Sequence, residues 1–137
     1  MSNPNVFIAN VAASRKRTGV MYCSGSFLPI IKQFQELIPG VKLFDCVDLF
    51  KNSITFSATD LLNAIENETK NNPTIVANIE TYIISNPNSY MEQLAKLLTI
   101  REPLKPLFFI FYSKKIFRKF RDQFESENLT HKNTIEF

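Results

Sequence analysis

The chain has 137 residues, of which 45% are hydrophobic and 21% are charged, and its formal net charge is +3. This length suits one domain, residues 1–137, with a core of its own, and the composition excludes a wholly disordered chain. The charge is weaker than that of most non-specific nucleic-acid binders, and no apolar segment approaches the about 18 residues of a membrane span.

Helix-like and strand-like patterns alternate along the chain. The first helical pattern ends in Arg15, Lys16 and Arg17, where cations suit the helix dipole, and Gly19 then breaks it. The later apolar runs TIVANI and LFFIFY are typical of central parallel strands. The expected helices cover 5–17, 27–38, 58–70, 90–101 and 114–125, and the expected strands cover 20–23, 41–47, 74–79, 107–112 and 134–137.

This alternation indicates βαβ units with right-handed crossovers. We therefore expect a three-layer αβα domain with a mainly parallel sheet of four to five strands. Ligands of such sheets bind beyond the carboxyl ends of the strands. The polar residues expected there are Ser24, Gly25 and Ser26, Asp45 and Asp48, Asn78 and Glu80, and Ser113 with Lys114.

The order of these groups is similar to the plan of a P-loop NTPase with a degenerate Walker A. Asn78 and Glu80 end a segment similar to a Walker B strand, and Ser24, Gly25 and Ser26 stand where the phosphate loop would lie. The pattern G-x-x-x-x-G-K-[ST] is incomplete, because no lysine follows Gly25 and the nearest one is Lys32. Loss of that charge should lower phosphoryl transfer by several powers of ten.

Plain structural roles explain the same residues. Asn78 and Glu80 can cap a strand, and Ser24 to Ser26 can form an ordinary turn. Asp45 and Asp48 can be solvated loop acids rather than metal ligands. A helix N-terminus after the first strand would still permit weak nucleotide or anion binding. We expect no tightly bound cofactor and no catalytic residue.

The same segment offers a thiol alternative. Cys23 and Ser26 form a C-x-x-S at a strand-to-helix junction, where thioredoxin-like proteins keep a cysteine of low pKa. That fold needs an antiparallel partner strand, whereas this pattern favours a parallel sheet. Cys46 and the single His131 lie too far along the chain to build a metal site with Cys23.

A basic helix offers a third alternative, contact with nucleic acid or an acidic partner. Phe117 and Phe120 interleave with its five cations, but aromatic residues at this spacing are also typical of a buried face. The cations are Lys114, Lys115, Arg118, Lys119 and Arg121.

The segments PTIVANIETYI and REPLKPLFFIFYSKK, followed by a charged terminal helix, resemble small P-loop-like proteins of bacterial phage-defence operons, in particular the small P-loop subunit of BREX phage-exclusion systems. The resemblance covers about residues 18–125. It implies a bacterial antiviral role in sensing or assembly, with other protein subunits or further copies of the chain as partners. The basic run follows the first apolar run, the reverse of a secretory signal, so we expect a cytoplasmic protein.

Overall fold

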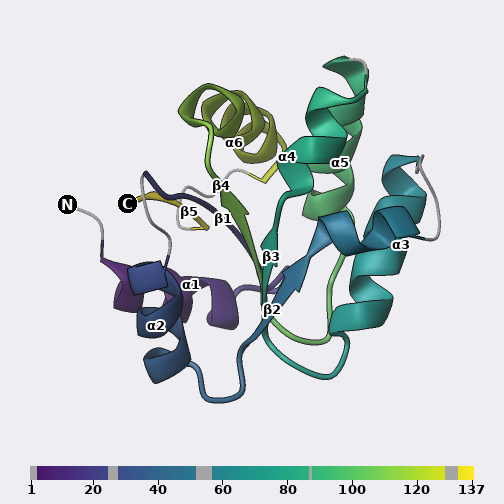
Figure 1. Cartoon of the computed structure of the whole chain (residues 1–137). Coiled ribbons are helices and arrows are strands. Elements are labelled where there is room, and N and C mark those ends of the chain that lie inside the picture. The colour runs from purple at the N-terminus through teal and green to yellow at the C-terminus, as the bar shows by residue number, and fades with distance from the viewer. Residues whose placement is uncertain (1–2, 25–27, 52–56, 87, 129–132) are drawn as a thin grey trace.

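Five parallel strands form a single sheet in a computed structural model of the chain, which describes residues 3–24, 28–51, 57–86, 88–128 and 133–137. The order across the sheet is β2-β3-β4-β1-β5, so β4 lies at the centre (Figure 1). The strands are β1 (Thr18–Tyr22), β2 (Lys42–Asp45), β3 (Thr74–Ala77), β4 (Leu107–Phe111) and β5 (Thr134–Glu136).

Helices cover both faces of this sheet (Figure 1). One face carries α1 (Pro4–Ala13) and α2 (Leu28–Leu37), and the other carries α3 (Ala58–Thr69), α4 (Ile79–Ile84), α5 (Asn88–Ile100) and α6 (Lys114–Asn128). A 3-10 helix, η1 (Cys46–Lys51), follows β2. The predicted three-layer α/β fold with a parallel sheet is therefore confirmed.

Strand β4 explains the two separate cores. All five of its residues are buried, and Phe108 and Ile110 pack with α1 and α2. Phe109 and Phe111 point to the opposite face and pack with the α3–α6 layer. Because side chains alternate along a strand, a strand buried on both faces must be apolar throughout.

Gly19 does not break the chain between two elements, as the sequence pattern predicted, but lies inside β1. A Cβ atom at this position would come within 2.7 Å of side-chain atoms of Phe7 and Val11 on α1. Glycine is therefore needed here so that α1 can lie directly against the strand. The predicted basic last turn of α1 is also wrong, because the helix ends at Ala13 and Ser14 adopts an extended conformation.

Two predicted strands are too long. Cys46 and Val47 belong to η1 rather than to β2. Strand β3 ends at Ala77 because Asn78 takes a left-handed conformation (φ +65°), and the unpredicted helix α4 begins immediately after it. Asparagine adopts this conformation more readily than most residues, so a single residue turns an unbroken apolar run from strand to helix.

The remaining elements agree with the prediction to within a few residues. Ser57 caps α3 by accepting a hydrogen bond from the Asp60 amide at 3.1 Å. Strand β5 pairs in parallel with β1 at the edge of the sheet. Of the α6 residues predicted to face inward, Phe117, Phe120 and Phe124 are fully buried, and Ile116 is partly buried.

Candidate functional site

The carboxyl ends of the parallel strands bring the predicted polar residues to one edge of the sheet, called here the carboxyl edge. Ser24 lies two residues after the end of β1, and Asp45 is the last residue of β2. Asn78 directly follows β3, and Ser113 lies two residues after the end of β4. This is the edge at which ligands of open parallel sheets bind. Gly25 and Ser26 lie outside the described residues, and Asp48 is exposed on η1.

Asn78 joins the ends of β2 and β3. Its side-chain amide nitrogen donates to Asp45 Oδ1 at 2.9 Å, and the same oxygen accepts the backbone N–H of Val47 at 2.9 Å. The left-handed backbone of Asn78 directs the chain into α4, while its side chain reaches back to the neighbouring strand. Asp45 is thus a turn-forming residue with two internal donors.

Glu80 joins the end of β3 to the end of β4. Its side chain is buried, with the residue only 8% exposed, in the first turn of α4. One carboxylate oxygen accepts the backbone N–H of Tyr112, and the other accepts that of Ser113 at 3.1 Å. Burial raises the pKa of Glu80, and the two amide donors oppose that rise.

Ser113 extends this connection into α6. Its side-chain oxygen accepts the backbone N–H of Ile116 at 3.3 Å, and its carbonyl accepts that of Phe117 at 2.9 Å. Ser113 therefore caps α6, and its own amide is held by Glu80. The carboxylate resembling a Walker B acid thus fixes the start of the longest helix described.

Tyr112 is a residue of this edge that the sequence analysis missed. Burial raises its pKa to about 12, as do the nearby groups Glu80, Asp45 and Cys23, so its hydroxyl stays protonated at neutral pH. Its position directly after β4, at the edge expected to carry ligands, was the signal that could have identified it.

Cys23 lacks the properties of a reactive thiol. It is 2% exposed, its Sγ lies 3.9 Å from the Ser24 carbonyl oxygen, and burial raises its pKa. Burial and the charge of Asp45 also raise the pKa of Cys46. Reactive cysteines have lowered pKa values instead. A thioredoxin fold also needs an antiparallel strand pair, whereas every pairing among the described strands is parallel. These observations count against the thioredoxin-like alternative.

The five cations of the basic helix divide into two groups. Two of them bind β5, since Arg118 Nη2 lies 3.3 Å and Arg121 Nη1 3.0 Å from the carboxylate of Glu136. The Arg121 guanidinium also lies 5.8 Å from the ring centroid of Phe117. The other group consists of exposed lysines on α6: Lys114, Lys115 and Lys119. Arg118 and Arg121 therefore help to hold the edge strand.

Comparisons with known proteins give this chain no family: no protein-family model and no curated protein sequence matches it. Among the described residues, no three or more His, Cys, Asp or Glu side chains are grouped to hold a metal ion. None of the described helices is long and apolar enough to cross a membrane. The observed feature of the carboxyl edge is its set of hydrogen bonds, which connect β2, β3, β4 and α6.

Proposed function

We propose that the protein is a non-catalytic, P-loop-like α/β domain that acts through contacts with other proteins. Support comes from the order of polar groups along the carboxyl edge, together with the absence of a lysine after Gly25. Such a domain keeps the scaffold of a nucleotide-binding fold and serves in assembly or sensing, as one subunit of a larger complex or as an oligomer.

The single observation that carries this proposal is the engagement of Glu80. A hydrolytic P-loop enzyme needs its Walker B acid to face the metal and the attacking water. Here both oxygens of the nearest equivalent accept backbone N–H groups of Tyr112 and Ser113. Removing the carboxylate from these donors would leave two amides at the start of α6 without an acceptor, which is costly.

The biological setting rests on the resemblance to the small P-loop subunit of BREX systems. On that basis we place the protein in a bacterial anti-phage defence complex, with the other subunits of the complex as partners. A weak nucleotide or anion site after β1 is compatible with a sensing role, because such a role needs binding without turnover.

ATP hydrolysis by the purified protein in the presence of Mg²⁺ tests the non-catalytic role. We expect no turnover above that of buffer, for the wild type and for Glu80→Gln alike. The control Glu36→Gln makes the same replacement at an exposed glutamate on α2. Turnover that is lost in Glu80→Gln and retained in Glu36→Gln would overturn the proposal.

Native mass spectrometry tests the role in assembly. The protein would be expressed together with the products of its neighbouring genes and purified under mild conditions. We expect a complex with at least one of them, or an oligomer of this chain, and the same spectrum reports any co-purified nucleotide. A strict monomer that associates with none of these products would contradict the proposal.

A further inference from the structure

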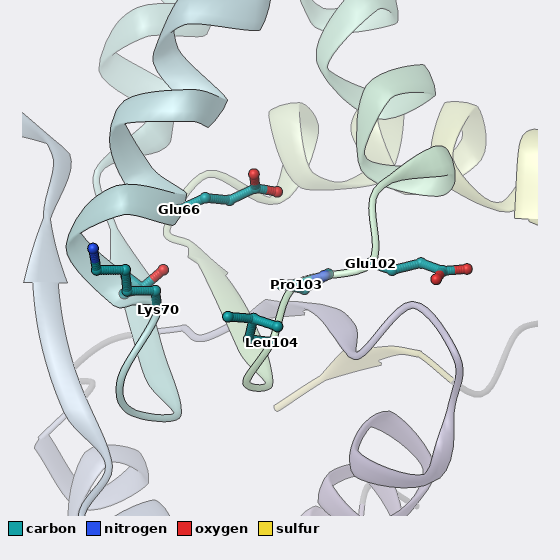
Figure 2. A pocket seen from close by; sticks show the side chains of 6 residues that line it. Glu66, Lys70, Glu102, Pro103 and Leu104 are labelled. Atoms are coloured by element: carbon teal, nitrogen blue, oxygen red, sulfur yellow. The ribbon is translucent and has the colours of Figure 1, made fainter.

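A small cavity lies at the edge of the sheet opposite the carboxyl edge, called here the amino edge. Thr69 and Lys70 contribute to it from the end of α3, and Pro103 and Leu104 from the connection between α5 and β4 (Figure 2). Its volume is about 180 Å³. This is below the roughly 300–1,000 Å³ of pockets that hold whole small molecules, so the cavity suits a single inserted side chain.

The wall of the cavity is held by contacts to the segment after α1. Arg15 Nε lies 2.8 Å from Glu102 Oε1, and Lys16 Nζ lies 3.6 Å from the same oxygen. Arg17 Nη1 donates to the carbonyl of Pro103 at 3.2 Å. Three successive cations therefore contact the connection that forms one side of the cavity.

Two more cations complete this surface. Arg101 Nη1 lies 2.7 Å from Glu66 Oε2, another residue that lines the cavity, and Lys70 is exposed at its side (Figure 2). We call the five cations the basic rim: Arg15, Lys16, Arg17, Lys70 and Arg101.

The basic rim carries a local excess of positive charge. Its five cations face two carboxylates, Glu66 and Glu102, an excess of three positive charges. Arg15, Lys16 and Arg101 are paired with these two carboxylates, and Lys70 lines the cavity itself.

Exposed apolar side chains accompany this charge. Leu104 is 75% exposed, and Ile100, next to Arg101 at the end of α5, is 64% exposed. Leu104 lies between Lys70 and Glu102 in the wall of the cavity (Figure 2). An exposed apolar side chain beside charged groups is typical of a protein-binding surface.

We infer that the amino edge is a docking surface for an acidic segment of another protein, which inserts one apolar side chain into the cavity between Lys70 and Leu104. The inference rests on the proposed function and states the chemistry of the partner. Acidic side chains would contact the basic rim and guide association, while the inserted apolar side chain would supply most of the affinity.

A phosphate backbone fits this surface less well than a protein does. Nucleic acid would use the cations of the basic rim but would leave Leu104 and Ile100 exposed to water. The amino edge also lies opposite Ser24, the first residue of the predicted phosphate loop. A partner bound there would leave the carboxyl edge accessible, as a sensing subunit requires.

A pair of synthetic peptides tests the inference. Both are short and rich in glutamate, and they differ only in one central residue, leucine or serine. Binding is followed by fluorescence anisotropy and by NMR shifts of the protein amides. We expect the leucine peptide to bind with saturable shifts at Thr69, Lys70 and Leu104, about tenfold more tightly than the serine peptide. Added salt should weaken both.

Matched variants test whether peptide binding depends on this surface or only on the overall charge and exposed apolar side chains of the protein. Lys70→Glu and Leu104→Ser should each weaken the leucine peptide by about fivefold to tenfold. Lys115→Glu makes the same charge change on α6, and Ile84→Ser removes an equally exposed apolar side chain (68%) from α4; neither should alter binding. Circular dichroism verifies that all four variants are folded.

Three results would overturn the inference. They are no saturable binding of the leucine peptide, equal binding of the two peptides, and binding unchanged in Lys70→Glu and Leu104→Ser. A DNA duplex that shifts Lys70 and Leu104 while the peptides do not would assign the surface to nucleic acid instead. ATP turnover by the protein would contradict the proposed function but leave the peptide result standing, so the two failures are distinguishable.

Discussion

The two edges of the sheet differ in how they use their polar residues. At the carboxyl edge, the carboxylates of Asp45 and Glu80 accept hydrogen bonds from groups within the fold. At the amino edge, cations outnumber carboxylates, and Leu104 and Ile100 are exposed. A position at the usual ligand edge does not by itself make a residue a ligand, because the same position also suits structural hydrogen bonds.

Substitution of Glu80 by alanine should have the largest effect on stability. It would leave the partly buried amides of Tyr112 and Ser113 without their acceptor, and an unsatisfied amide removed from water costs about 1–3 kcal/mol. We expect a loss of about 3 kcal/mol in the free energy of unfolding, measured by urea titration. Glu36→Ala, at an exposed site on α2, should change it by less than about 0.5 kcal/mol. Equal effects of the two variants would remove the structural role of Glu80.

Substitution of Asn78 should have the next largest effect. Asn78→Ala removes the hydrogen bond to Asp45 and places alanine in a left-handed conformation, for an expected loss of about 2 kcal/mol. Asn78→Gly removes the same hydrogen bond without the conformational cost, so it should be about 1 kcal/mol more stable than Asn78→Ala. Thermal or urea unfolding of both variants measures this difference. Equal stability would show that the backbone of Asn78 is unstrained.

The pH dependence of stability should report the burial of Glu80 as a smaller effect. Its pKa is raised in the folded state, so the folded protein binds this proton more tightly than the unfolded chain. The resulting stabilisation is fully present below the unfolded pKa and is lost as pH rises through the folded pKa. The free energy of unfolding of the wild type, minus that of Glu80→Gln, should therefore fall with rising pH. A difference that rises instead would mean that the two amide donors outweigh burial.

The amino edge should tolerate substitution with the smallest effect on stability. Leu104→Ser and Lys70→Glu change exposed side chains, so we expect changes in the free energy of unfolding below about 0.5 kcal/mol. Together with the loss after Glu80→Ala, this would sharpen the contrast between a structural edge and a binding edge. A large loss of stability in Leu104→Ser would break the contrast, because it would give Leu104 a structural role.

Local patterns predicted much of the fold. The apolar faces of α3 and α6 and the apolar run of β4 could be predicted from periodicity. A helix buried on one face repeats its apolar residues with the helical period, whereas a strand buried on both faces is apolar at successive positions. Helix α4 was missed because TIVANIETYI contains neither glycine nor proline to mark the turn. The role of Gly19 was misread because the residues that approach it, Phe7 and Val11, belong to another element.

The sequence predicted where the candidate site lies but not which hydrogen bonds its residues make. Parallel strands end at a common edge, so the gathering of Asp45, Asn78 and Ser113 followed from the expected topology. Glu80 accepts hydrogen bonds from Tyr112 and Ser113, which lie more than thirty residues further along the chain. Local sequence patterns therefore could not predict these contacts. Likewise, the pairing of Arg118 and Arg121 with Glu136 could not be read from the helix alone.

The sequence by itself determined the class of fold, the order of its elements and the absence of a lysine after Gly25. These properties depend on local periodicity and on the presence or absence of particular residues. Only the tertiary structure decided that Glu80 joins two strand ends, that Gly19 admits a helix, and that Lys70, Glu102 and Leu104 line one cavity. The physical reason is that hydrogen bonds, close packing and local charge arise between residues that are distant in the chain and become neighbours on folding.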